Sequence, residues 1–289
     1  MIDLHTHSTA SDGTYTPTEL IIEAKNSGLS VMALTDHDTV AGVAEAQNAG
    51  KIHGVHVIPG IEISVEWQPG ELHLLGLGIN PESPALIELM QYAQQKRQER
   101  NIKIIEKFKS EGIAINTEKL SELVGNSVIG RPHFARYLVL EKKVKTIQEA
   151  FQKYLAKGRP FYIEKECIPL QDAIRIVKES CGVPVLAHPM SLYLSWSKLP
   201  DAIAQFKEEG LIGLEAWHPT ARYAECVRLE ELAEQLGLIV TAGSDFHGAN
   251  RKDVYLGKTV NNIPIDDRFY TENLLPALTQ AGSAPAIGR

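Results

Sequence analysis

Seven short apolar runs occur along the chain and predict the strands of a sheet. They are rich in Val, Ile and Leu and do not alternate strictly with polar residues, which is typical of parallel strands buried on both faces. The runs cover residues 2–4, 31–35, 55–58, 72–77, 183–187, 212–217 and 238–241.

The segments between many of these runs carry helix signals. The tetrapeptide that starts at Thr16 has capping-box spacing with proline at the first helical position, so we expect a helix over 17–26 that Gly28 ends. Further helices are expected over 170–179 and 221–236. Strands that alternate with helices predict a β/α barrel, whose active site lies at the carboxyl ends of the strands.

One long stretch interrupts this alternation. Between residues 81 and 166 no run has the pattern of a buried strand, and helices are expected over 84–110, 117–124, 133–140 and 147–157. We therefore predict a barrel domain built from 1–80 and 167–289, with 81–166 as a helical insertion that contributes substrate-binding residues. The Gly/Ala/Pro-rich end, 281–289, is expected to fray.

Composition narrows the classes of protein. A chain of 289 residues that is 44% hydrophobic can bury the core of one barrel, and its net charge of −7 excludes bulk attraction to nucleic acid. Bound divalent ions would place positive charge locally, so an anionic substrate stays compatible. Cys167, Cys181 and Cys226 show no CxxC pairing and indicate reduced thiols in a cytoplasmic protein. No stretch is long and apolar enough for a membrane span or reads as a signal peptide.

Imidazoles and carboxylates recur just after, or near the end of, these apolar runs. Six of the ten histidines do so, and the two-residue spacing of His5 and His7 on an extended segment points both side chains the same way. A lone histidine is more often a hydrogen-bonded structural residue, and we interpret His53 and His56 in that way. His218 follows a strand without matching the pattern and is a candidate partner of a ligand. The joint pattern predicts a cluster of divalent metal ions.

The sequence resembles a known family, the polymerase and histidinol phosphatase (PHP) superfamily. The motifs that carry the resemblance appear in order: His5-Thr6-His7, Asp12, Thr35-Asp36-His37-Asp38, Pro59-Gly60-Ile61-Glu62, His73, Ala187-His188-Pro189 and Ser244-Asp245-Phe246-His247. The resemblance implies a distorted seven-stranded β/α barrel that holds two to three metal ions.

The resemblance also implies which residues hold each ion. The first ion would take His5, His7, Glu62 and Asp245; the second Asp12, His37 and His247; the third Glu62, His73 and His188, with Glu62 bridging. Asp36 and Asp38 are interpreted as turn residues that orient His37. Nitrogen and oxygen donors without thiolate fit Mn²⁺, Zn²⁺, Fe²⁺ or, less well, Mg²⁺ and do not choose among them. We expect Mn²⁺.

A candidate substrate site lies in the predicted insertion. Arg97, Arg100 and Asn101 share one face of a helix, a spacing that can clamp a phosphate. Composition alone favours a solvated helix face. The resemblance favours substrate binding, because a nucleotide-cleaving subgroup of the family carries such a helix together with a segment similar to the one that holds Arg131 and His133.

The resemblance implies a metal-dependent phosphoesterase, similar to bacterial 3′,5′-nucleoside bisphosphate phosphatases and to exoribonucleases that trim short 5′-phosphorylated RNA from the 5′ end. A hydroxide that bridges two metal ions would attack phosphorus in line. The expected partners are a phosphorylated nucleotide and, alternatively, short RNA, without a membrane or an obligate protein partner.

Three alternatives stay open. They are a histidinol-phosphatase-like hydrolase of small phosphate esters, a metal-dependent amidohydrolase with a different ligand set, and a PHP module kept for structure or protein binding. The filled ligand positions argue against the last, since such modules tend to lose ligands.

Overall fold

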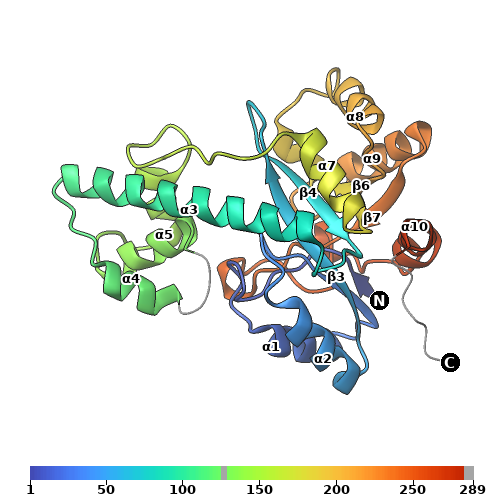
Figure 1. The fold of residues 1–289 in the computed structure, drawn as a ribbon, viewed down its shortest axis with the longest axis horizontal. Coiled ribbons are helices and arrows are strands. Elements are labelled where there is room, and N and C mark those ends of the chain that lie inside the picture. Colours follow the sequence, from blue (N-terminus) through green and yellow to red (C-terminus); the bar gives the residue numbers. More distant parts are fainter. Residues whose placement is uncertain (125–128, 283–289) are drawn as a thin grey trace. The chain divides into compact units, whose positions relative to one another are not determined.

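The structure is a computed structural model that describes residues 1–124 and 129–282. Seven strands form one sheet in sequence order from β1 to β7 (Figure 1). The strands are β1 (Ile2–Asp3), β2 (Val31–Leu34), β3 (His56–Val65), β4 (Leu72–Leu77), β5 (Val183–Leu186), β6 (Gly213–Trp217) and β7 (Ile239–Ala242).

The sheet curls into a nearly closed barrel. The backbone N–H of Leu4 donates to Ala242 O at 3.3 Å, and a parallel bridge joins Thr6 to Phe246. These contacts bring the segment after β1 to the segment after β7. The predicted α/β barrel of seven strands is confirmed.

The prediction of a parallel sheet is wrong for one strand. β4 runs antiparallel to both β3 and β5, whereas the other neighbours are parallel. β3 is also longer than the apolar run 55–58, because its second half continues to Val65 and pairs with β4. A short antiparallel connection replaces one helical crossover, and it carries the start of β4 to the rim where the parallel strands end.

Helices connect most of the strands and form the segment between β4 and β5. They are α1 (Pro17–Asn26), α2 (Val43–His53), α3 (Pro84–Ser110), α4 (Thr117–Val124), α5 (Arg131–Leu140), α6 (Ile147–Ala150), α7 (Leu170–Glu179), α8 (Leu199–Glu208), α9 (Tyr223–Leu236) and α10 (Leu275–Ala281). The predicted capping box of α1 is present, since Thr16 N–H donates to Glu19 Oε2 at 2.8 Å and Glu19 N–H donates to Thr16 Oγ1 at 3.2 Å.

Several helix boundaries differ from the predictions. α9 starts two residues later than expected and α5 two residues earlier, and the predicted helix over 147–157 divides into α6 and the π-helix Phe151–Leu155. The sequence pattern did not single out α2, α8 and α10. The part of the predicted frayed end over 283–289 lies outside the described residues.

Packing divides the chain into two units. The barrel unit comprises Met1–Met90 and Ile168–Arg289, and the helical unit comprises Gln91–Cys167. The first turns of α3 belong to the barrel unit because Leu86 and Leu89 are buried in its core.

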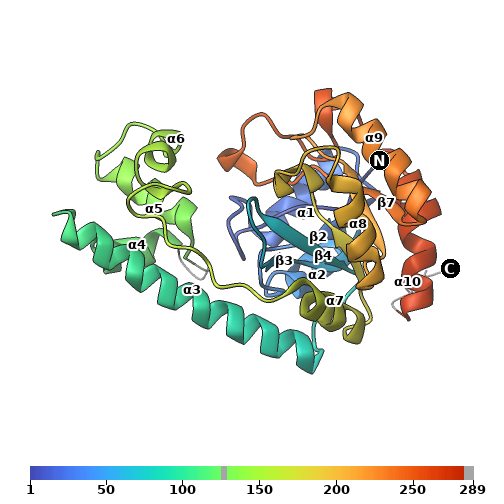
Figure 2. The same ribbon diagram turned by 90° about the horizontal axis from the view of Figure 1, so that it is seen from above.

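The helical unit has its own core, and its helices appear in green in Figures 1 and 2. Phe108 and Phe161 pack within it with tilted rings whose centroids are 4.0 Å apart, and Phe108 and Phe134 are fully buried. Among the described residues, no helix combines the length and apolarity needed to cross a membrane.

Candidate metal centre

Two histidines that follow β1 lie at the middle of the site. His5 and His7 are buried, at 0% and 1% exposure, and their rings are 5.2 Å apart. The extended segment that carries them is held by Thr6, whose hydroxyl donates to Ala33 O at 2.7 Å. The pairing with neighbouring segments therefore fixes both imidazoles on the same side of the chain.

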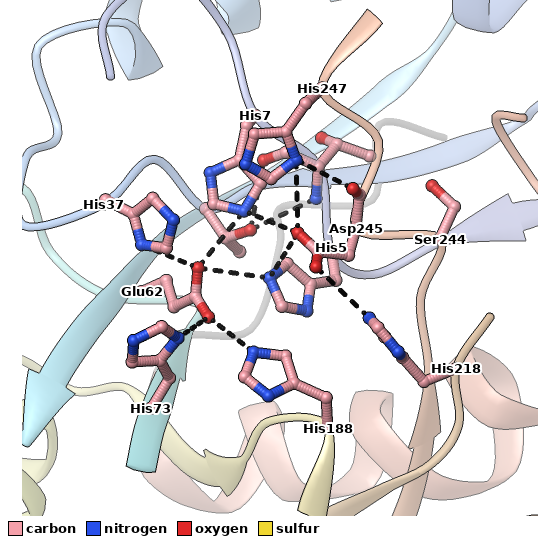
Figure 3. Close-up of polar contacts among 12 residues, drawn as sticks. His5, His7, His37, Glu62, His73, His188, His218, Ser244, Asp245 and His247 are labelled. Carbon is pink, nitrogen blue, oxygen red and sulfur yellow. Dashed lines mark hydrogen bonds and ion pairs between the residues drawn. The ribbon is translucent and has the colours of Figure 1, made fainter. Parts of the chain in front are cut away.

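Glu62 and Asp245 complete the innermost group, as Figure 3 shows. His7 Nε2 lies 3.2 Å from both Glu62 Oε2 and Asp245 Oδ1. His5 Nε2 lies 3.4 Å and 3.6 Å from the same two oxygens. Two imidazole nitrogens and two carboxylate oxygens thus face one point.

This group fits a metal ion. The Nε2 atoms of His5 and His7 and Oε2 of Glu62 are buried, and none has a hydrogen-bond partner among the described residues. An ion with tetrahedral bonds of about 2.1 Å keeps its ligand atoms about 3.4 Å apart, which matches the separations seen here. The buried lone pairs are therefore spaced as ligands of a single divalent ion.

A second group adjoins the first. His247 Nε2 lies 3.1 Å from Asp12 Oδ1, and His37 Nε2 lies 3.9 Å from the same oxygen. The four residues His7, Asp12, His37 and His247 offer ligand atoms that all lie within 4.8 Å of one another. The structure thus brings together the three residues predicted for the second ion and adds His7 to them.

Glu62 also reaches a third group. His73 Nδ1 and His188 Nε2 lie 2.7 Å and 3.0 Å from Glu62 Oε1, while Oε2 faces the first group. Glu62 thus has the bridging geometry that the resemblance implied. His37 Nδ1 approaches Glu62 Oε2 at 2.9 Å, so His37 stands between the second and third groups.

The placement of Glu62 and His73 differs from the prediction that such residues lie just after, or near the end of, a strand. Glu62 lies inside β3, and His73 is the second residue of β4. Because β4 is antiparallel, its first residues reach the same rim as the carboxyl ends of the parallel strands.

The electrostatics of the group favour bound cations. Burial opposes ionisation of Glu62, but His37, His73 and His5 outweigh it and hold the pKa of Glu62 well below its usual value. Burial also opposes a charged His7, yet Asp245 and Glu62 raise the pKa of His7 to about 9. A metal ion would replace these protons as the positive partner of the carboxylates, so binding releases protons.

Glu215 is a site residue that sequence reasoning missed. It is fully buried in β6, where Oε1 accepts from His5 Nδ1 at 2.9 Å and Oε2 accepts from the backbone N–H of His188 at 2.8 Å. The bond fixes the His5 tautomer that leaves Nε2 free to bind metal. A lone carboxylate in an otherwise apolar strand was the signal.

Asp3 was missed in the same way. It is buried in β1 and accepts from Ser244 Oγ at 2.6 Å and from Gly257 N–H at 2.9 Å. Burial raises the pKa of Asp3 to about 6, against the opposing effect of these hydrogen bonds. Asp3 thereby ties the segment that carries Asp245 to the first strand.

The remaining polar neighbours orient the ligands. His218 Nε2 lies 3.3 Å from Asp245 Oδ2, as a partner of a ligand would, and Arg251, also missed, donates to the same oxygen. Asp36 accepts from the backbone and hydroxyl of Ser8, and Asp38 accepts from Ser64 N–H. These bonds tie the segment after β2 to the segment after β1 and to β3. His53 and His56 lie at the end of α2 and the start of β3, outside these groups.

The candidate substrate residues all lie in the helical unit. Arg100 and Asn101 are largely buried, at 5% and 8% exposure, and Asn101 Nδ2 donates to Ile129 O at 3.0 Å. A Cβ on Gly130 would lie 3.2 Å from an Arg97 guanidinium nitrogen, so glycine allows close approach there. The face of α3 and the start of α5 therefore meet.

Arg131 and His133 lie in the first turn of α5. The guanidinium of Arg131 lies over the Tyr162 ring, 5.3 Å from its centroid, and His133 Nδ1 accepts from Gly130 N–H at 3.0 Å. This bond leaves Nε2 as the protonated ring nitrogen of a neutral His133. The structure thus gathers the five predicted substrate residues, whose binding role stays a prediction.

A barrel with this cluster at one rim defines a metal-dependent hydrolase, and comparison with known proteins identifies its family. The chain belongs to the PHP domain family, whose model matches residues 3–166.

Three similar proteins cover nearly all of the chain. It is 34% identical to a 5′-3′ exoribonuclease of Haemophilus influenzae over 85% of this chain and 89% of the relative. It is also 34% identical to a 3′,5′-nucleoside bisphosphate phosphatase of Chromobacterium violaceum over 91% of this chain and 93% of the relative. A solved structure from Bifidobacterium adolescentis, described as a candidate metal-dependent phosphoesterase, superposes with a TM-score of 0.85 at 29% identity, covering 100% of this chain and 98% of that one.

Proposed function

We propose that this protein is a metal-dependent phosphoesterase that hydrolyses the 3′-phosphate ester of nucleoside 3′,5′-bisphosphates and removes nucleotides from the 5′ end of short 5′-phosphorylated RNA. The observation that carries the proposal is the convergence of His5, His7, Glu62 and Asp245 on one point. The group of Asp12, His37 and His247 with His7 lies beside it, and His73 and His188 contact Glu62. The names of the similar proteins support both substrates.

The two activities are one reaction. Water adds to phosphorus, the bond from phosphorus to the 3′ oxygen breaks, and that oxygen takes a proton. A bisphosphate yields nucleoside 5′-monophosphate and inorganic phosphate; RNA yields the same nucleotide and a chain one residue shorter with a new 5′-phosphate. In both cases the nucleotide on the 5′ side must be held while its 3′ ester is opened.

The residues of the cluster form three sets of metal ligands in this proposal. His5, His7, Glu62 and Asp245 would hold one ion, Asp12, His37 and His247 a second, and Glu62, His73 and His188 a third. When bound, such ions lower the pKa of a water molecule and offset charge on the phosphoryl group. We propose Mn²⁺, because the donors are imidazoles and carboxylates without thiolate.

The helical unit would select the substrate. We propose that Arg97 and Arg100 bind the 5′-phosphate through charge-assisted hydrogen bonds. Arg131 lies at the start of α5, where the helix dipole also favours an anion. His133, as a neutral ring with Nε2–H, would donate to a phosphate oxygen. Asn101 holds the segment before α5 in place through Ile129.

The proposed setting is the cytoplasm. The chain has three cysteines, an odd number, and none of them forms a CxxC pair, which fits a reducing compartment. The reaction as proposed uses a nucleotide or short RNA and needs neither a membrane nor a protein partner.

A screen of phosphoesters in the presence of manganese tests the proposal. The substrates are adenosine 3′,5′-bisphosphate, adenosine 3′-monophosphate, histidinol phosphate and a short 5′-phosphorylated RNA. We expect the bisphosphate and the RNA to be hydrolysed with the highest kcat/KM. Preference for histidinol phosphate would favour a small-molecule phosphatase, and no turnover with metal bound would favour a non-catalytic module.

A further inference from the structure

A cavity with polar and charged lining residues adjoins the metal centre in the barrel unit. It has a volume of about 340 Å³ and is lined by the segment after β6, including His218 and Thr220, and by the segment after β7, including Asn250, Arg251 and Lys252. A larger cavity of about 580 Å³, near His56 and Gly78, includes none of the candidate ligands among its lining residues. Of these two cavities, only the smaller one is lined by a residue, His218, that contacts a candidate metal ligand.

Asp245 contacts the candidate metal ligands with one carboxylate oxygen and residues that line the cavity with the other. Its Oδ1 faces His7 Nε2 at 3.2 Å, whereas Oδ2 faces His218 Nε2 at 3.3 Å and receives a hydrogen bond from Arg251. In Figure 3, Asp245 lies between His218 and the pair formed by His7 and His247. A group bound in the cavity would thus lie one side chain away from the reacting phosphorus.

The lining suits an anionic sugar phosphate. Arg251 keeps 41% of its side chain exposed while it contacts Asp245, so other guanidinium donors face outward. Lys252 is exposed and makes no ion pair with any residue that the structure describes. Of the two cations in the described lining, Arg251 pairs with Asp245, and Asp253 is the one carboxylate among the lining residues. The volume falls in the range of sites for small organic ligands, about 300 to 1,000 Å³.

The two proposed substrates differ beyond the phosphorus that reacts. A bisphosphate ends at the phosphate that is cleaved, whereas RNA continues from it into the next nucleotide. A contact with that next nucleotide therefore affects RNA and leaves the bisphosphate untouched. We propose that the cavity bounded by His218, Arg251 and Lys252 binds the ribose phosphate that follows the cleaved bond; this inference rests on the proposed function.

Lys252 is the residue to test, because it lines the cavity without contacting a candidate metal ligand. The variants Lys252→Ala and Lys252→Glu are compared with the parent on adenosine 3′,5′-bisphosphate and on 5′-phosphorylated triadenylate. For the RNA we expect kcat/KM to fall about threefold to tenfold with alanine and further with glutamate, since one phosphate contact is lost or reversed. For the bisphosphate we expect no change. Lys198→Ala, an exposed lysine outside the lining, is the matched control and should change neither.

The outcomes separate this inference from the proposed function. Equal losses on both substrates, or none on RNA, overturn the inference, and so does a parent that hydrolyses the bisphosphate and not the RNA. A parent that hydrolyses neither substrate refutes the proposed function and the inference with it.

Discussion

The barrel unit and the helical unit assemble their polar residues by different routes. In the barrel, His5 and Asp245 come from opposite ends of the chain and meet because β1 and β7 close the sheet. In the helical unit, Arg97 and Arg131 come from two nearby segments that meet over Gly130. The first set is formed only when the whole barrel folds, whereas the second belongs to a unit with its own core.

This difference suggests that the barrel unit carries out the hydrolysis and the helical unit selects the substrate. The barrel set is buried and mutually dependent, since Glu62 touches members of all three groups. The helical set acts, in our proposal, on a phosphate that does not react. A change in the barrel should therefore affect every substrate, and a change in the helical unit should affect only substrates that carry a 5′-phosphate.

The largest effect is expected for Glu62→Ala. The substitution removes both oxygens that join the groups and leaves an excess of imidazoles around a cavity, so metal should be lost and hydrolysis of every substrate abolished. Metal content and turnover on bisphosphate and RNA check this. Glu66→Ala, an exposed glutamate near the end of the same strand, is the control and should behave as the parent. Turnover by Glu62→Ala in the presence of chelator would contradict the metal mechanism.

Arg100→Ala should produce a selective loss. A charge-assisted contact with the 5′-phosphate contributes about 1.5–3 kcal/mol. We therefore expect kcat/KM for adenosine 3′,5′-bisphosphate to fall roughly tenfold to a hundredfold and that for adenosine 3′-monophosphate to stay nearly constant. Lys103→Ala, on the same helix and exposed, is the control. Equal losses on both substrates would mean that Arg100 acts on the fold or on the reacting phosphate, and the proposed division between the units would be wrong.

Glu215 allows the barrel set to be weakened without removing a ligand. Glu215→Ala frees the ring of His5 and leaves the N–H of His188 without its acceptor, so metal affinity should fall roughly tenfold to a hundredfold. Glu215→Gln should fall between, because its amide oxygen can accept one of the two hydrogen bonds. Metal titration of the stripped protein measures this directly. Parent-like affinity in both variants would show that His5 is positioned without Glu215.

The functional residues of the barrel unit could be predicted from the sequence more directly than those of the helical unit. The metal set was predictable because histidines and carboxylates recur at successive strand ends, and closure of the barrel turns that order along the chain into proximity. The arginine face of α3 was not predictable from composition, since a solvated helix has the same pattern, and only the resemblance favoured binding. Exposure of 5% for Arg100 differs from that solvated alternative.

The errors have physical causes. The direction of β4 depends on its pairing with β3 and β5, which an isolated apolar run does not encode. Glu215 and Asp3 escaped notice because each is a single carboxylate within a buried strand, without the histidine motif that marks the other site residues. Their role appears only when the strands bring them to His5 and Ser244.

The smallest effect is expected for the cysteines, and it tests whether the described groups suffice for metal binding. Cys181 is exposed, Cys167 is half-buried and Cys226 is fully buried in α9, and no group of potential metal ligands among the described residues includes any of them. Replacing all three with alanine should keep kcat and metal stoichiometry. Truncation at Cys226 should cost about 1 kcal/mol of folding free energy, because a buried sulfur is removed beside Ala221 and Val260. Denaturant unfolding and metal analysis of the triple variant measure both quantities. A fall in bound metal would show that a thiol takes part, and the assignment of the centre to imidazoles and carboxylates alone would be wrong.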